Sequence, residues 1–167
     1  MFASLFSFPN PVNEVSARLV AGGVVLMALA AIVFDQPWIT LVLAFGFVAR
    51  VLSGPTLSPL GQFVTRVLTP ALPFDEKLVP GPPKRFAQAI GALFSVTAAV
   101  LAIGFGQTGA AFVVLGVLAA FATLESVFGI CVGCKVFALL MRAGIVPAEV
   151  CESCNQISFT APATATD

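Results

Sequence analysis

The sequence predicts an all-α fold in which four transmembrane helices form a bundle. Hydrophobic residues make up 59% of the 167-residue chain, whereas charged residues make up only 10%, and the mean hydropathy is +1.04. Because soluble domains carry about 25% charged residues, we expect so apolar a chain to lie in a lipid bilayer. Four apolar segments approach the roughly 20 residues that a helix needs to cross the bilayer. They leave room for connecting loops and little else.

Two short turns and one long loop are expected to join the spans. The spans are predicted at residues 15–34, 38–52, 85–105 and 110–130. Pro37 marks the first short turn because proline cannot continue a helix, and the glycines of residues 106–109 mark the second. Trp38 stands where an interfacial anchor is expected. We interpret the first segment as a retained span rather than a cleavable signal peptide, because no basic residue precedes Arg18.

The long loop between the second and third spans is predicted to contain a further short helix. Gly54-Pro55 and residues 81–83 bracket this loop, which is rich in proline. Apolar residues inside it recur at helical spacing, namely Leu60, Phe63, Val64, Val67 and Leu68. The pattern predicts a helix that lies on the membrane surface or packs against the ends of the bundle, and the sequence leaves both open.

All the basic residues fall on one side of the predicted bundle. They are Arg18, Arg50, Arg66, Lys77, Lys84, Arg85, Lys135 and Arg142. The two short turns on the other side contain no lysine or arginine. Because the basic side of a membrane protein faces the cytoplasm, we expect both termini and all four cysteines there.

Small residues repeat every four positions along the third span, at Ala87, Gly91, Ser95 and Ala99. Such a stripe lets two helices approach closely. We interpret it as a packing seam within one chain, and a homo-oligomer interface is the alternative.

The residue types present restrict the chemistry. The chain has no histidine and no tyrosine, which excludes a histidine-ligated haem or zinc site and a Ser-His-Asp triad. Its net charge of +0 argues against binding nucleic acid through the phosphates. Metal or redox chemistry must therefore rest almost entirely on thiols.

The four cysteines form two Cys-x-x-Cys pairs directly after the last span. Sixteen residues separate Cys131 and Cys134 from Cys151 and Cys154. This spacing is typical of a four-thiolate zinc site, in which both sulfurs of each pair bind one metal ion. We expect the segment between the pairs to be helical and to turn back at residues 144–147.

The same residues fit thiol–disulfide chemistry. A Cys-x-x-Cys pair closes a disulfide, and its first thiolate attacks a partner's disulfide or carries a sulfane sulfur. Lys135 adds positive charge beside Cys134 and favours the thiolate, whereas Glu152 disfavours it beside Cys151. We therefore expect Cys131 to be the nucleophile and Cys134 the resolving thiol.

Two charged residues lie inside the predicted spans. Glu125 is in the fourth span and Arg50 is near the end of the second, at similar depth on the cytoplasmic side. An unpaired charge there is costly, so we expect an ion pair between Arg50 and Glu125. A proton relay through Glu125 that serves the thiols, and snorkelling of the side chains to water, are the alternatives.

Several stretches resemble a known protein family. They are PPKRFAQAIG at 82–91, CVGCKVF at 131–137, and Arg50 with Ser53-Gly54-Pro55 and Ser58-Pro59. These stretches are similar to those of small bacterial integral membrane proteins catalogued as a domain of unknown function (family 4395), and the resemblance covers residues 12–137. It implies a multi-pass protein of the bacterial inner membrane that carries its cysteine motif at Cys131 and Cys134. It also implies a thioredoxin-like or sulfurtransferase partner.

Three hypotheses about function follow. The first is thiol–disulfide exchange or sulfur relay at the cytoplasmic face, which would make the protein a thiol–disulfide oxidoreductase. The second is a membrane scaffold whose four cysteines bind structural zinc, and the third is a small transporter-like oligomer with Arg50 and Glu125 along its path. In each, residues 1–130 form the membrane domain, 131–157 a cysteine-bearing cytoplasmic segment packed on the bundle, and 158–167 a disordered tail.

Overall fold

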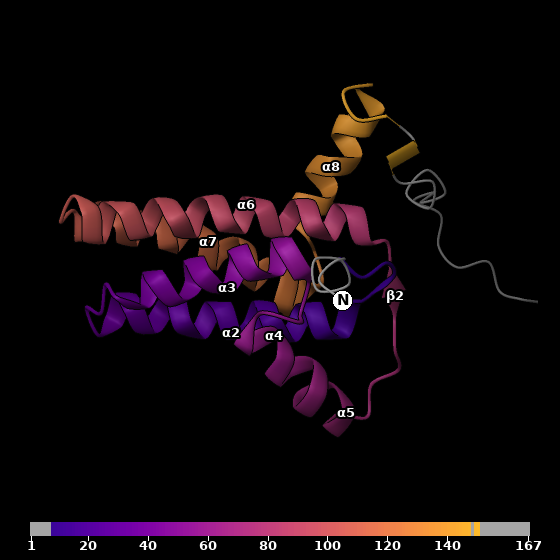
Figure 1. Cartoon of the computed structure of the whole chain (residues 1–167), viewed down its shortest axis with the longest axis horizontal. Helices are drawn as coiled ribbons and strands as arrows, with labels where there is room; N and C mark the ends of the chain where they lie inside the picture. Colours follow the sequence, from indigo (N-terminus) through magenta and orange to yellow (C-terminus); the bar gives the residue numbers. More distant parts are fainter. Residues whose placement is uncertain (1–7, 148, 151–167) are drawn as a thin grey trace, which may run out of the picture.

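The computed structural model describes residues 8–147, 149 and 150, and most of these residues are helical (Figure 1). In this part of the chain the only strands are β1 (Val12–Asn13) and β2 (Leu78–Val79), which pair antiparallel. The predicted all-α class is therefore confirmed.

Four long helices form the body of the molecule. They are α2 (Glu14–Val33), α3 (Ile39–Ser53), α6 (Gly81–Ala99), which the π-helical turn η2 (Val100–Gly104) extends, and α7 (Thr108–Phe128). They coincide with the four predicted spans, except that α6 begins at Gly81 rather than at residue 85. By length and apolar composition α2, α6 with η2, and α7 are able to cross a membrane. Helix α3 is equally apolar but has 15 residues, fewer than the roughly 20 that a bilayer requires.

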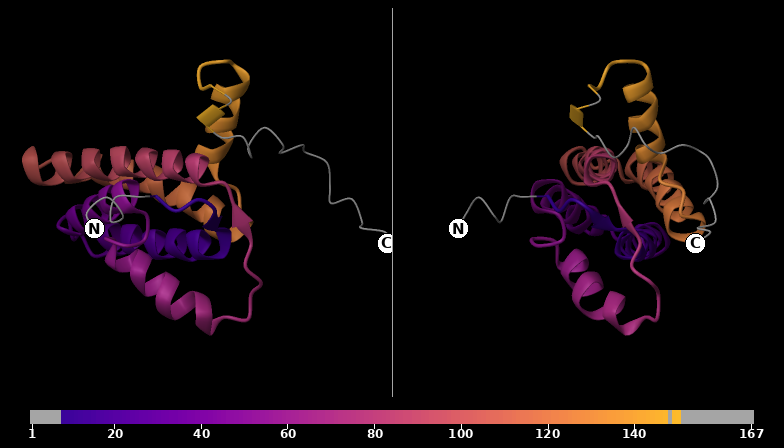
Figure 2. Two further views of the ribbon diagram at one scale, coloured as in Figure 1. Left: turned by 45° about the vertical axis from the view of Figure 1, so that its right-hand side comes forward. Right: turned by 90° about the vertical axis from the view of Figure 1, so that its right-hand side faces the viewer.

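The long helices lie side by side, with α2 against α7 and α3 against α6 (Figures 1 and 2). Their shared core consists largely of small side chains, including Ala28, Ala31, Ala98 and Ala111, packed around Leu43 and Leu115. Small residues allow helix backbones to approach closely. At Gly91 of α6, an added Cβ would lie only 2.2 Å from Cε1 of Phe47 on α3. The stripe of small residues on α6 thus packs within one chain, as we interpreted it.

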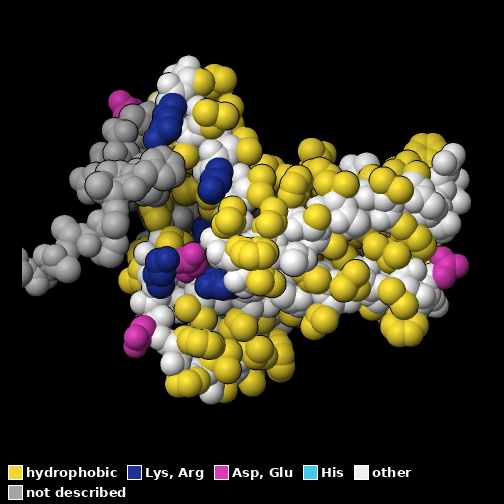
Figure 3. Space-filling model, turned by 180° about the vertical axis from the view of Figure 1, so that it is seen from behind, with side chains coloured by type: hydrophobic (Ala, Val, Ile, Leu, Met, Phe, Trp, Pro, Cys, Tyr) yellow, Lys and Arg dark blue, Asp and Glu magenta, His cyan; other side chains and the backbone are white. Residues whose placement is uncertain are grey.

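Large apolar side chains cover the outside of the bundle. Leu26, Phe105 and Val113 are 71%, 72% and 69% exposed. Figure 3 shows hydrophobic side chains along the length of the bundle, whereas the lysine and arginine side chains in that view gather at the end that carries α8 (Val132–Arg142). Soluble monomers rarely expose apolar surface on this scale. The surface therefore suits a lipid environment.

A continuous helical segment follows α3 and confirms the short helix predicted in the long loop. It comprises α4 (Pro59–Phe63), the π-helical turn η1 (Val64–Leu68) and α5 (Thr69–Ala71). One side packs on α2, where Val64 is buried and Leu60 lies against Gly23. On the other side Phe63 and Val67 are more than half exposed, at 54% and 53%. The segment thus packs against the bundle and still presents an apolar outer face.

The start of α2 is tied to the chain that leads into α6. Asn13 caps α2 by accepting a hydrogen bond from the Val15 N–H at 2.9 Å. Beside it, Glu14 pairs with Lys77 at 2.8 Å, and the Glu14 N–H donates to the Lys77 carbonyl at 2.7 Å. Together with the β1–β2 pairing, these contacts close the end of the bundle from which α8 projects (Figure 1).

Replacing Gly91 with alanine is expected to destabilise the bundle, because the added methyl group would overlap the Phe47 ring. Overpacking of this kind costs about 1–3 kcal/mol. Gly116 of α7 is the matched control, since a Cβ there meets no atom within 4 Å. Gly116→Ala should leave the stability unchanged or raise it, as alanine favours helix. Thermal unfolding in detergent measures both variants, and a Tm of Gly91→Ala equal to that of the wild type would contradict the packing.

Candidate functional site

The turn after α7 sets the position of the first cysteine pair. Gly129 ends α7 in the left-handed conformation, with φ at 68°, and its N–H donates to the Glu125 carbonyl at 3.1 Å. Glycine is common at such helix ends because it has no Cβ to clash. Arg18 of α2 donates to two carbonyls of the same last turn, at Ser126 and Val127. Only three residues separate the two helices, so α8 begins close to the end of α7 and projects from that end of the bundle (Figure 1).

Cys131 is the N-cap residue of α8. Its sulfur accepts a hydrogen bond from the backbone N–H of Cys134, with a distance of 3.4 Å between the sulfur and the nitrogen. Cys131 is buried and Cys134 is partly buried, and both are free thiols. A sulfur at the N-terminus of a helix faces the positive end of the helix dipole, which favours the thiolate.

The two thiols differ in acidity. The Cys134 thiol donates a hydrogen bond to the Cys131 sulfur, which lowers the pKa of Cys131 and raises the pKa of Cys134. Burial adds to the rise in the pKa of Cys134 and opposes the fall in the pKa of Cys131. The charge of Glu125 raises both pKa values, and the charge of Lys84 lowers both. Cys131 is therefore the thiol that ionises more readily, and its role as the nucleophile stays a prediction.

Lys84 is the functional residue that sequence reasoning missed. Its amine pairs with the Glu125 carboxylate at 2.7 Å, and both side chains are largely buried. We expected Glu125 to pair with Arg50, but its partner is Lys84. The early start of α6 explains the difference, because it places Lys84 in the first helical turn, facing α7. Pro82 and Pro83 could have indicated this early start, since proline is favoured in the first turn of a helix.

Lys135, which we expected to supply positive charge to the thiols, is exposed on α8. The lysine that acts on both cysteines is Lys84. Residues adjacent in a helical sequence point in different directions, so Lys135 need not face its neighbour Cys134.

Arg50 lies inside the bundle, with only 4% of its surface exposed. Its Nε donates to Oε1 of Gln88 on α6 at 3.1 Å, and its guanidinium lies over the Phe47 ring at 4.4 Å from the ring centre. Its Nη1 is buried and has no hydrogen-bond partner in the described part of the chain. A buried guanidinium with an unused donor is unusual, because buried polar groups normally find partners.

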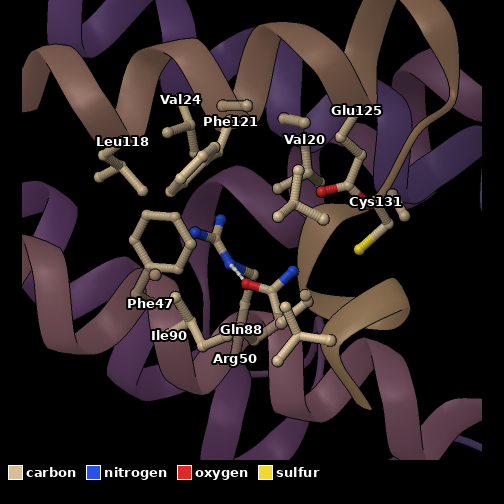
Figure 4. Close-up of a pocket in the computed structure, with 18 residues that line it drawn as sticks. Val20, Val24, Phe47, Arg50, Gln88, Ile90, Leu118, Phe121, Glu125 and Cys131 are labelled. Carbon is tan, nitrogen blue, oxygen red and sulfur yellow. Dashed lines mark hydrogen bonds between the residues drawn. The ribbon is translucent and has the colours of Figure 1, made fainter. Parts of the chain in front are cut away.

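Arg50, Glu125 and Cys131 face one internal cavity of about 200 Å³ (Figure 4). Apolar side chains such as Phe47 and Phe121 line most of the rest of it. The structure thus brings three of the expected site residues together. Because they come from α3, α7 and the turn before α8, no local sequence pattern could have shown this grouping.

Cys131 also lines a second, more open cavity of about 460 Å³, which lies between α8 and the chain that leads into α6 and which we call the outer groove. This outer groove is bordered by Cys134, by one acidic residue and by four basic residues, namely Glu14, Lys77, Lys84, Lys135 and Arg142. Cys131 therefore lies between an internal cavity and an outer groove.

Helix α8 is held against α6 by close packing. The Phe137 and Phe86 rings lie 5.5 Å apart, centre to centre. A Cβ on Gly133 would lie 2.6 Å from both Cα and Cβ of Ala87, so the two backbones are in direct contact. This contact fixes the cysteine pair relative to Lys84 of the same helix.

The second cysteine pair, Cys151 and Cys154, lies outside the described residues, as does the predicted tail 158–167. Within the described residues, no group of three or more histidine, cysteine or acidic side chains is placed to hold a metal ion. A four-cysteine zinc site needs both pairs, so it stays a prediction. Helix α8 and the turn at Gly144 do agree with the expected course of the segment between the pairs.

The family described as "Domain of unknown function (DUF4395)" matches residues 12–142. The match covers most of the chain, so the chain belongs to this family, and the resemblance seen at 82–91 and 131–137 is confirmed. It runs from β1 to the end of α8 and includes Cys131 and Cys134, whereas the second pair lies beyond it. No curated protein and no solved structure matches the chain.

Lys84→Met is expected to slow alkylation of Cys131 at neutral pH by several-fold. The lysine lowers the pKa of Cys131, so its loss raises that pKa and reduces the thiolate fraction. The rate of iodoacetamide labelling would be followed against pH by mass spectrometry of the Cys131 peptide. Cys151 and Cys154 would be replaced by serine so that they cannot interfere.

Lys135→Met is the matched control for this experiment, because it removes an exposed lysine from the same neighbourhood. We expect its labelling profile to match that of the parent. Equal slowing in the two variants, or slowing only in Lys135→Met, would show that the wrong lysine has been assigned to the thiols.

Proposed function

We propose that this DUF4395 protein is a multi-pass protein of the bacterial inner membrane that carries out thiol–disulfide exchange or sulfur relay at its cytoplasmic end. The observation that carries the proposal is the Cys131 sulfur at the N-cap of α8, hydrogen-bonded by Cys134 and placed near Lys84. Helix dipole, hydrogen bond and lysine all favour a thiolate at Cys131, and a second thiol stands within reach to resolve its adducts.

In the exchange reaction, the Cys131 thiolate attacks one sulfur of a partner's disulfide. A mixed disulfide forms, and the partner's other sulfur leaves as a thiolate. Cys134 then gives its proton to that thiolate, attacks the Cys131 sulfur and closes the Cys131–Cys134 disulfide. The partner leaves as one thiol and one thiolate, reduced by two electrons, and the protein is oxidised by two.

The relay reaction uses the same nucleophile. The Cys131 thiolate takes the outer sulfur of a partner's persulfide and becomes a persulfide itself, and the partner leaves as a thiolate. In both reactions we propose a soluble thioredoxin-like or sulfurtransferase protein as the partner. The outer groove supports this, because it gives such a protein access to Cys131 and Cys134.

The membrane arrangement that we propose uses all four long helices, with α3 as the second span. Its 15 residues rise about 22 Å, less than the roughly 30 Å of the hydrocarbon core. Thinning of the bilayer at a short helix accommodates such a mismatch. The basic residues at the α8 end support a cytoplasmic position for that end, and we propose the same side for both termini.

Ellman's reagent should distinguish the roles of the two thiols in a Cys151→Ser/Cys154→Ser background. We expect the dithiol protein to release two thionitrobenzoate ions per chain and to end as an intramolecular disulfide, because Cys134 displaces the second ion. Cys134→Ser should release one and keep a mixed disulfide, since serine cannot displace it. Cys131→Ser should react more slowly, because burial still raises the pKa of the Cys134 thiol that remains.

Two results of this experiment would contradict the proposal. One is a product that carries a separate adduct on each cysteine with no internal disulfide, as shown by intact-mass spectrometry. The other is wild-type protein, purified without chelator, that contains about one zinc ion per chain and leaves all four thiols unreactive. That result would favour the structural zinc site instead.

The proposed orientation can be tested with two single cysteines in an otherwise cysteine-free chain. Gly109→Cys lies at the turn between α6 and α7, and Lys135→Cys lies on the exposed side of α8. In intact cells, a membrane-impermeant maleimide should label Gly109→Cys strongly and Lys135→Cys only after permeabilisation. The opposite pattern would place the thiols outside the cell, and labelling of both would exclude a spanning arrangement.

A further inference from the structure

The Arg50 side chain provides a buried donor that the thiol chemistry does not use. One face of its guanidinium lies over Phe47, and its Nε is occupied by Gln88. The remaining buried donor, Nη1, has no partner in the described part of the chain. In Figure 4 the guanidinium projects into the internal cavity between Phe47 and Gln88.

While Cys131 is protonated, the charges near this cavity do not balance. Glu125 is the one carboxylate among the residues that line it, and it is paired with Lys84, which leaves Arg50 without a carboxylate in direct contact. Removing an ion from water is unfavourable unless an opposite charge and hydrogen bonds compensate it. One further negative charge next to Arg50 would neutralise the group.

The size and lining of the cavity limit what can supply that charge. Its volume of about 200 Å³ exceeds the roughly 150 Å³ that accommodates a benzene molecule in another protein. Its walls are mainly apolar, which suits a weakly hydrated ion better than a strongly hydrated one. The guanidinium offers directed N–H donors, and the Gln88 amide, whose oxygen accepts from Arg50, carries two more.

We propose that the internal cavity binds a small inorganic monoanion, held by Nη1 of Arg50. The anion reaches Cys131 from the inside of the bundle, whereas a protein partner reaches it from the outer groove. A role for this anion in the chemistry of Cys131 rests on the thiol function proposed above. The binding of the anion in the cavity does not depend on that function. Binding is therefore measured separately from thiol reactivity.

Azide is the probe, because its infrared stretching band changes when the ion leaves water. The protein is reconstituted in phosphatidylcholine nanodiscs, and azide is titrated against the wild type and against a variant with all four cysteines replaced by serine. We expect both to show the same saturable, shifted band. The serine variant also removes any thiolate-bound metal to which azide would bind, so the anion site is tested even if the thiol function fails.

Arg50→Gln should weaken azide binding by about tenfold or more, the effect of losing a charged hydrogen bond. Arg66→Gln, which changes an exposed arginine of η1, is the matched control and should bind azide like the wild type. Ala122→Leu takes up part of the cavity and keeps Arg50 itself unchanged, so it should also reduce binding. This second variant keeps the test valid if Arg50→Gln does not fold.

The proposal is overturned if the wild type shows no saturable band, or if Arg50→Gln, once shown to be folded, binds azide as tightly as the wild type. Phosphatidylglycerol nanodiscs exclude the other source of negative charge. A free-anion site gives the same azide affinity in both lipids. Loss of azide binding in phosphatidylglycerol would assign the cavity to a lipid headgroup and would also overturn the proposal.

Discussion

The ion pair between Lys84 and Glu125 is the interaction on which the site depends. It joins the first turn of α6 to the last turns of α7 at 2.7 Å, in a place where both side chains are largely withdrawn from solvent. Two such ions are tolerable in an apolar interior only as a close, hydrogen-bonded pair. The lysine lowers the pKa of both cysteines although it is paired with the carboxylate. Because that carboxylate is paired with the lysine, Arg50 contacts Gln88 and Phe47 instead. The electrostatics of the thiols and the isolation of Arg50 therefore have a common origin.

The geometry of helix ends provides the second half of the arrangement. A left-handed glycine stops α7, and the chain turns at once into α8, so that a cysteine rather than a serine or aspartate becomes the N-cap. An N-cap side chain normally accepts a backbone N–H through oxygen. With sulfur in that position, the interactions that begin the helix also favour the ionised thiol. Local structure and reactivity are thus set by the same few residues.

Hydropathy was sufficient to predict the four long helices and the helical segment of the loop, because an apolar segment in this chain has few alternatives to helix. It could not fix where α6 begins, since Pro82 and Pro83 were read as part of the loop although proline is favoured in a first helical turn. That error concealed Lys84 and gave Glu125 the wrong partner.

The candidate site was predictable in part. The spacing of Cys131 and Cys134 identified the candidate pair, but the cavity that Cys131 shares with Arg50 depends on how α3, α6 and α7 are rotated about their axes. When a helix is apolar on all sides, its sequence does not show which of its faces points into the bundle. The involvement of Cys151 and Cys154 lies outside the described residues and stays a prediction.

The contact between Gly133 and Ala87 has a consequence for the two positions enclosed by the Cys-x-x-Cys motif. Any side chain at position 133 would clash with Ala87 and push α8 away from α6, so this position tolerates only glycine while the two helices are in contact. Val132 is under no such restriction and forms part of the wall of the internal cavity. In chains that keep this arrangement, the side chain at position 132 can therefore vary and change the volume of the internal cavity next to the Cys131 sulfur. Position 133 stays glycine.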